Sequence, residues 1–170
     1  MNNLRFWLLS LIAVLAFGSI AAAQKPEKLG DFTAWQAFRM VEPSGQVVCW
    51  MLTDPQASEP GNLRRGDPWL RVAHRPGQET RVVSFESGFP MDASKRPIAS
   101  VGGKNFAMFS KGGETAWSHP DDDASMITAL KRGLSLTIES RSARGNDIRD
   151  QFSLRGFTKA YDKISQACNV

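Results

Sequence analysis

The sequence is short of the side chains on which catalytic and metal sites usually depend. It has two cysteines, two histidines and one tyrosine in 170 residues. The patterns of common hydrolases, GxSxG, HExxH and the Ser-Lys signature, are absent. We therefore expect a protein that is not an enzyme and that carries no cofactor and no metal.

A long apolar run occurs in one place, at the N-terminus. Arg5 gives a basic start, residues 6–20 are apolar, and the small residues Ala21-Ala22-Ala23 follow. This is the order of a secretory signal peptide. The run is shorter than the roughly 20 residues of a membrane span, so an uncleaved anchor is the less favoured alternative. We predict cleavage after Ala23 and export of residues 24–170 as a single domain.

Neither sign of charge dominates the chain. The formal net charge is +4 at pH 7, and the leader holds Arg5 and no acidic residue, so its removal leaves +3. This mild basic bias suits weak attraction to anionic lipid or polysaccharide surfaces. The basic residues are scattered and the protein is expected to be exported, so we expect no nucleic-acid partner.

Cys49 and Cys168 form no CxxC pair and have no histidine close by in sequence, which argues against a metal site or a catalytic thiol. Disulfides persist in exported proteins, and we interpret the two cysteines as one bridge. Closing a loop of more than a hundred residues stabilises a fold by roughly 4–5 kcal/mol in the chain-entropy model.

Apolar segments predict a series of short strands. We expect a first strand within residues 29–43 and a largely buried strand over Gln46–Thr53. Residues 54–68 hold three prolines and two glycines and are predicted to form a loop. Gly102-Gly103 suits the turn of a hairpin. The other strands are expected at 69–75, 80–87, 97–101, 104–109, 134–139 and 147–154, and Lys111–Glu114 is expected to form a turn that leads to Thr115-Ala116-Trp117.

Two helices are predicted in the second half of the chain. Asp121-Asp122-Asp123 precede an apolar stripe and Lys131-Arg132-Gly133 follow it, in accordance with the helix dipole and C-cap rules. From Phe157 onwards apolar residues recur at helical spacing, and Cys168 lies on their stripe. We expect this stripe to face the core, where the strand that carries Cys49 can meet it.

These elements predict a mainly β fold of seven or eight strands. The expected architecture is an antiparallel β-sandwich or a partly open barrel with two short helices. The C-terminal helix is expected to pack on the sheet.

Several segments, in order along the chain, are similar to one bacterial family. They are Arg64–Leu70 with His74-Arg75-Pro76, Gly88-Phe89-Pro90, Gly103–Phe106, Thr115-Ala116-Trp117, Ser142–Gly145, and Ser153–Tyr161 with Ile164 and Ala167-Cys168. Over nearly its whole mature length the chain resembles the invasion-associated locus B family.

The resemblance implies an exported protein of a Gram-negative bacterium, periplasmic, secreted or associated with the outer membrane. It brings no enzymatic activity and no cofactor, and founding members are linked to entry into host cells. Many relatives have a second cysteine pair with one member in the first strand. Trp35–Phe38 contains no cysteine, so the resemblance implies the Cys49–Cys168 bridge alone.

The two histidines are the candidates for catalysis or metal binding. His74 shares a strand face with Leu70 and Val72, as a buried structural histidine does, and the alternative is the base of a hydrolase. His119 lies beside the acidic triplet 121–123, which offers a divalent cation site as a second alternative. Three consecutive acids point in different directions and are explained by the helix start, so we do not favour a metal.

Arginines are the candidate residues for binding an anion or a partner. Guanidinium groups recognise phosphate and carboxylate bidentately, and Arg71 and Arg75 are expected to project to one face of a strand. A solvated sheet face is the structural alternative. The candidate set is Arg64, Arg65, Arg71, Arg75 and Arg81. Three tryptophans are interpreted as core or semi-core residues, with stacking on sugars or an interface as the alternative; they are Trp50, Trp69 and Trp117.

We therefore expect a non-enzymatic envelope protein whose working surface is the arginine-bearing strand pair with the loop 54–68. Its expected partner is an envelope component, such as lipopolysaccharide or an outer-membrane protein, or a host protein. Peripheral membrane association and a contribution to host-cell invasion in pathogenic relatives are part of this hypothesis. The alternatives are a hydrolase that uses His74 and a structural, stress-related periplasmic protein.

Overall fold

A computed structural model describes residues 25–170, and the predicted signal peptide, residues 1–23, lies outside this range. Eleven strands and two helices occur in the described residues. In chain order they are β1 (Glu27–Phe32), β2 (Trp35–Val41), β3 (Val47–Thr53), β4 (Ala57–Glu59), β5 (Trp69–Arg75), β6 (Glu79–Glu86), β7 (Ile98–Val101), β8 (Lys104–Ala107), β9 (Thr115–Trp117), α1 (Asp123–Arg132), β10 (Ser135–Arg141), β11 (Asp147–Ser153) and α2 (Phe157–Cys168).

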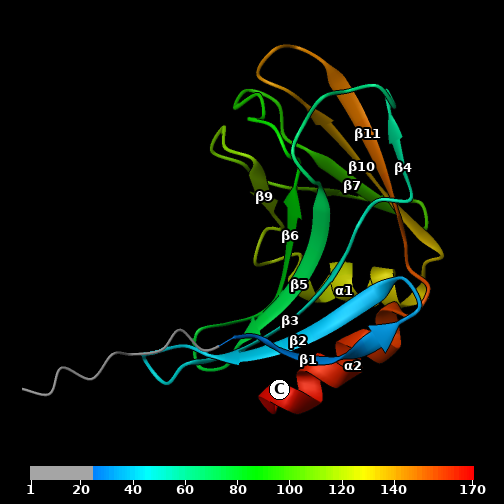
Figure 1. Cartoon of the computed structure of the whole chain (residues 1–170). Coiled ribbons are helices and arrows are strands. Elements are labelled where there is room, and N and C mark those ends of the chain that lie inside the picture. Colours follow the sequence, from blue (N-terminus) through cyan, green and yellow to red (C-terminus); the bar gives the residue numbers. More distant parts are fainter. Residues whose placement is uncertain (1–24) are drawn as a thin grey trace, which may run out of the picture.

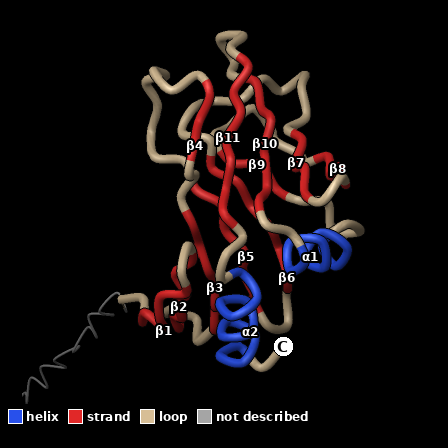
Figure 2. The backbone as a smooth tube through the Cα atoms, turned by 90° about the vertical axis from the view of Figure 1, so that its right-hand side faces the viewer, coloured by secondary structure: helices blue, strands red, loops and turns tan. Residues whose placement is uncertain are grey.

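The strands form two antiparallel sheets. The six-stranded sheet has the order β1-β2-β3-β5-β6-β9, and the five-stranded sheet has the order β4-β11-β10-β7-β8. The five-stranded sheet lies over one end of the six-stranded sheet, and both helices lie at the other end (Figure 1 and Figure 2). The prediction of a mainly β, antiparallel two-layer fold is confirmed, and the sheets do not close into a barrel.

The hydrophobic core lies between these two layers. In β5 the side chains of Leu70, Val72 and His74 are buried while their neighbours along the strand are half-buried, which confirms the predicted alternation. Phe85 of the six-stranded sheet meets Phe152 of the five-stranded sheet edge to face, with ring centroids 6.1 Å apart. The core is therefore continuous across both sheets.

Helix α2 packs on the six-stranded sheet through the apolar stripe that the sequence predicts. Its buried residues include Phe157, Ile164 and Cys168, and the Phe157 ring lies edge-on to Trp35 of β2, with centroids 5.0 Å apart. Cys168 is bonded to Cys49 of β3, with the two sulfurs 2.07 Å apart. The predicted bridge is thus present in the structure and joins α2 to the centre of the sheet.

The single first strand expected within residues 29–43 is wrong, because this segment contains most of β1 and all of β2. Thr33 and Ala34 form the turn between them, and Thr33 has a φ of 58°, which β-branched residues rarely adopt. Tertiary contacts hold the turn: the Ala34 N–H donates to the Arg155 carbonyl, and the Thr53 hydroxyl donates to the Ala34 carbonyl. Distant residues therefore stabilise a turn that has no local sequence signal.

Three further expectations need correction. The loop 54–68 contains β4, which pairs with β11 at the edge of the five-stranded sheet. Leu134 is not part of a half-buried strand: its side chain is 85% exposed, and β10 begins at Ser135. The described residues hold eleven strands where seven or eight were expected, because residues 29–43 contain parts of two strands and because β4 and β9, of three residues each, have too short a pattern to detect.

Gly156 allows α2 to begin against the β1–β2 turn. It has a φ of 91°, and a Cβ atom at this position would lie 1.8 Å from the Phe32 carbonyl oxygen. No other residue fits such a close backbone approach. This glycine belongs to the segment Ser153–Tyr161, so that part of the family resemblance has a structural basis.

We expect the double variant Cys49→Ala/Cys168→Ala to lose about 4–5 kcal/mol of unfolding free energy, because the bridge closes a long loop. The two cysteines are 119 residues apart. Urea unfolding of the oxidised protein and of the variant measures the difference. A loss below about 1 kcal/mol would show that packing of α2 alone holds the helix in place.

Candidate binding face

The two sheets differ in the surfaces that they turn away from the core. On the five-stranded sheet the outward residues Glu139, Arg149 and Gln151 are polar and exposed, as is usual for the solvated face of an antiparallel sheet. On the six-stranded sheet most outward residues are apolar or aromatic and half-buried. We call this surface the outer face; its main residues are Phe38, Trp50, Leu52, Trp69, Arg71, Ala73, Val82, Ser84 and Trp117.

Aromatic side chains on the outer face pack in pairs. Phe38 and Trp50 are cross-strand partners and stack with ring centroids 5.5 Å apart. The guanidinium of Arg71 lies over the Trp69 ring, 5.2 Å from its centroid. The predicted semi-core position of the three tryptophans thus corresponds to half-buried residues on one common surface.

Arg71 lies near the middle of this face without a carboxylate partner. No acidic oxygen of the described residues lies within 4.0 Å of its guanidinium, and its Nε is buried without a hydrogen-bond acceptor. Ser84, its partner across the β5–β6 pair, also has a buried hydroxyl without a hydrogen bond. A positive charge and a hydroxyl donor therefore lie side by side, both unsatisfied.

Burial lowers the pKa of Arg71, and the positive charge of Arg75 lowers it further, against the opposing effect of Glu86. An arginine stays protonated at neutral pH in spite of such a shift. The shift shows that the surroundings of Arg71 disfavour its charge, so an added anion has a charge to neutralise there.

The other candidate arginines differ from Arg71. Arg75 lies on the same face, as predicted, but forms an ion pair of 2.8 Å with Glu42. Arg64 is an exposed loop residue, and Arg81 is exposed at a φ of 68° where the β5–β6 register shifts. Arg65 points into the core, away from the predicted surface. The structure thus brings two of the five arginines together on the outer face.

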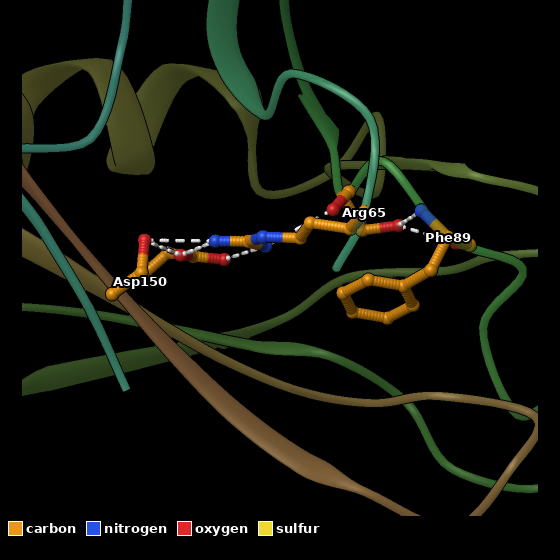
Figure 3. A network of polar contacts seen from close by, with 5 residues as sticks. Arg65, Phe89 and Asp150 are labelled. Carbon is orange, nitrogen blue, oxygen red and sulfur yellow. Dashed lines mark hydrogen bonds and ion pairs between the residues drawn. The ribbon is translucent and has the colours of Figure 1, made fainter. Parts of the chain in front are cut away.

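Arg65 forms a buried network with Asp150 (Figure 3). The Arg65 side chain is 7% exposed and Asp150 of β11 is fully buried. Both guanidinium Nη atoms donate to the carboxylate, and Nη1 also donates to the Ser87 carbonyl, 3.0 Å away. Ser58 of β4 accepts from Arg65 at 2.8 Å and donates to Asp150 at 2.6 Å. These donors are used inside the protein, so Arg65 has a structural role.

Two of the family-like segments build this network. The Gly66 N–H donates to the Gly88 carbonyl at 2.8 Å, and a Cβ atom on Gly88 would lie 2.3 Å from the Gly66 carbonyl oxygen. The Arg65 guanidinium lies 5.7 Å from the centroid of the Phe89 ring. The close approach of the segments around Gly66 and Gly88 therefore places Arg65 in the network.

We expect Arg65→Met to cost about 3–5 kcal/mol of unfolding free energy, because it leaves a buried carboxylate without its partner. Arg75→Met is the matched control: it breaks a half-exposed ion pair and should cost at most about 1 kcal/mol. Adding Asp150→Leu to Arg65→Met should recover part of the loss. Equal costs for the two arginine variants in urea unfolding would contradict the structural role of Arg65.

His74 is fully buried between the sheet and α2. The Arg81 backbone N–H donates to its Nδ1 at 3.1 Å, so the proton resides on Nε2, which donates to the Ser165 hydroxyl at 3.1 Å. Tyr161 lies edge-on to the imidazole, with ring centroids 5.3 Å apart. Burial, followed by the nearby charge of Arg81, lowers the pKa of His74 to about 4.

This geometry does not suit a catalytic base. Ser165 lies within hydrogen-bond reach, as a hydrolase requires, but Nε2 already carries the proton that it would have to accept. No acidic side chain orients the ring from the Nδ1 side. The hydrogen bonds instead attach α2 to β5 beside the disulfide, whose Cys49 is the cross-strand partner of His74.

We expect stability to fall as the pH drops from 6.5 to about 4, the ordinary and the folded pKa of His74. In this window the unfolded chain binds a proton that the folded protein excludes. The free energy of unfolding therefore falls by about 3 kcal/mol in total. Urea unfolding at several pH values measures this fall in the free energy of unfolding. His74→Gln should remove this part of the pH dependence and His119→Gln should keep it. An unchanged pH profile in His74→Gln would contradict the assignment.

The second histidine and its acidic neighbours do not converge. His119 and Asp121 lie 3.4 Å apart with both side chains largely exposed, and no cluster of three or more potential metal ligands occurs among residues 25–170. Asp123 begins α1 and accepts a hydrogen bond from Ser118. The acidic triplet thus marks the helix start, as the dipole argument predicts.

Two hollows open on the surface of the described residues. One, of about 600 Å³, lies over the five-stranded sheet and has charges of both signs, among them Lys95, Glu139 and Arg149. The other, of about 550 Å³, adjoins the outer face at Val82 and Trp117. His74 lines neither of them.

Fold and surface together define a disulfide-bridged, mainly β protein with two sheets and an aromatic outer face. Residues 35–165 match the family model described as Invasion associated locus B (IalB) protein. The chain therefore belongs to this family, which is not known as an enzyme family. No curated protein and no solved structure matches the chain. In the described part of the chain, no helix is long and apolar enough to cross a membrane.

Sequence reasoning missed two residues of this region. Ser84 gives no signal, because a serine within a strand is ordinarily solvated or bonded to a neighbour. Phe109 was placed inside a strand, yet β8 ends at Ala107 and Phe109 is 39% exposed. Its position against Trp117 depends on an isolated bridge between the segment after β8 and the last residue of β9, which no local pattern predicts.

Proposed function

We propose that this IalB family member is an exported, non-enzymatic envelope protein that binds an anionic envelope component on its outer face. Arg71 is the anion-binding residue of this proposal. The observation that carries it is the half-buried guanidinium of Arg71, which has no carboxylate partner among the described residues and lies on an aromatic surface. Arg65 and the loop 54–68 belong to the structural support and not to the binding surface.

The energetics of Arg71 support an external anion. Burying a charge without a partner is costly, whereas a carboxylate or phosphate placed there gains charge-assisted hydrogen bonds of roughly 1.5–3 kcal/mol each. Aromatic side chains around the charge exclude water and strengthen the attraction.

An exported location fits the chemistry of the fold. Disulfides such as the Cys49–Cys168 bridge form and persist in oxidising compartments such as the periplasm, which supports export, and the proposed ligand belongs to the envelope. Lipopolysaccharide carries phosphates and acidic sugars and is the anionic component that we favour. In relatives that enter host cells, the same face would act in contact with the host, as a contribution to invasion.

We expect the mature protein to co-sediment with phosphatidylcholine vesicles that contain lipopolysaccharide, and not with vesicles of phosphatidylcholine alone. Binding should weaken as salt is added, because ions screen the charges. Arg71→Gln should lower the affinity about tenfold, the loss of one charge-assisted bond.

Two variants are matched controls for Arg71→Gln. Arg149→Gln removes an exposed arginine beside the hollow of the five-stranded sheet, and Arg75→Gln removes the arginine that Glu42 already neutralises. Both should bind nearly as the wild type does. Equal loss in Arg149→Gln, or no loss in Arg71→Gln, would refute Arg71 as the anion-binding residue.

A further inference from the structure

The hollow beside the outer face lies between the free end of β6, the stacked pair Phe109–Trp117 and the start of α1. Its volume of about 550 Å³ falls in the range of about 300–1,000 Å³ that is usual for small-molecule sites. Short β9 pairs with Ser84–Glu86 and leaves the first half of β6 uncovered on this side. We call this hollow the groove.

One wall of the groove is aromatic. The rings of Phe109 and Trp117 stack with their centroids 5.7 Å apart and an interplanar angle of 30°. Two backbone hydrogen bonds between the same residues, both 2.9 Å long, fix the pair. Phe109 is nevertheless 39% exposed, the most exposed aromatic side chain in the described residues. A rigid, partly uncovered aromatic surface thus faces the groove.

The remaining walls of the groove carry both hydrogen-bond donors and acceptors. Glu79 and Asp123 supply acceptors, Lys111 supplies donors, and Thr80 supplies both. Asp123 is held in place by the hydrogen bond from Ser118. Burial raises the pKa of Asp123, and the charges of Glu79 and Asp122 raise it further, while the Ser118 bond opposes the shift.

An aromatic wall beside charged and hydroxyl groups favours a sugar ring over a lipid chain as the ligand. A lipid chain would desolvate the carboxylates and the ammonium group without replacing their hydrogen bonds, which is costly. The hydroxyls of a sugar both donate and accept, so they suit donors and acceptors in one place. The C–H groups of a sugar ring are weakly positive and pack on the negative face of an aromatic ring.

The groove is continuous with the anion site. Val82 in the groove and Ser84 beside Arg71 are successive residues on the same face of β6, about 7 Å apart along the strand. Arg71, Ser84 and Trp117 are consecutive cross-strand partners. A ligand with one ring in the groove therefore reaches Arg71 with a neighbouring acidic group.

We propose that the groove binds a sugar ring, so that the ligand of the outer face is an acidic carbohydrate recognised by Arg71 and by the Phe109–Trp117 pair together. This inference rests on the proposed function, because Arg71 holds the acidic group. It adds the ligand class: the sugar part of lipopolysaccharide, rather than its lipid part or a protein, is recognised.

Isothermal titration with the lipid-free core oligosaccharide of lipopolysaccharide tests the proposal, with lipid A vesicles as the second probe. The oligosaccharide should bind, and Phe109→Ala should weaken its binding about tenfold through loss of ring stacking. Leu134→Ala is the matched control, since it removes an exposed apolar side chain that does not line the groove. It should bind as the wild type does.

The outcomes separate this inference from the proposed function. Binding of lipid A vesicles that depends on Arg71, with no binding of the oligosaccharide, would overturn the sugar groove and leave the anion site standing. Equal affinities of Phe109→Ala and Leu134→Ala for the oligosaccharide would also overturn the groove. Loss of binding in Phe109→Ala but not in Arg71→Gln would support the groove and refute the anion site.

Discussion

The ion pair between Arg65 and Asp150 is the interaction on which one end of the structure depends, the end that holds the five-stranded sheet (upper part of Figure 1). A carboxylate on the inward face of β11 is very costly in a hydrophobic core unless a charge and hydrogen bonds compensate it. Arg65 supplies both, and its contacts with Ser58 and Ser87 connect β4, β11 and the end of β6. The chain before β5 must therefore lie where this guanidinium reaches Asp150. Two glycines that allow a close backbone crossing secure that path.

The other end of the structure, which holds α2, has its own links between elements. Which groups these links use shows which groups remain for a function. There the disulfide and the hydrogen bonds of His74 attach α2 to β3 and β5. The inward-facing groups that looked reactive in the sequence thus have structural roles: His74 and the two cysteines attach α2 to the six-stranded sheet, and Arg65 compensates the buried charge of Asp150 in β11. Of the three buried polar atoms without hydrogen-bond partners in residues 25–170, two lie on the outer face of the six-stranded sheet, on Arg71 and Ser84, and the third is the hydroxyl of Ser140 in β10.

Sequence patterns predicted much of this fold because they report local periodicity. The alternation of β5, the Gly102-Gly103 hairpin, α1 with its charged ends and α2 with Cys168 on its apolar stripe all agree with the structure. The β1–β2 turn and β4 were missed because distant residues form them, Arg155 and Thr53 in one case and β11 in the other. The same limit applies to the site: Arg71 and Arg75 share a strand, so their common face was predictable, whereas the burial of Arg65 depends on Asp150, 85 residues away.

An aromatic outer face with a half-buried arginine that lacks a carboxylate partner lowers the stability of the free protein. A polar residue at each outward position would solvate the sheet at no cost, as it does on the five-stranded sheet. Arg71 instead lies between Leu52 and Ser84, with a tryptophan beneath it and its Nε without an acceptor. Buried polar atoms without partners are rare in folded proteins and call for an explanation. In the proposed function, an anion bound by the Arg71 guanidinium accounts for the arrangement, since the cost of this charge in the free protein then becomes affinity in the complex.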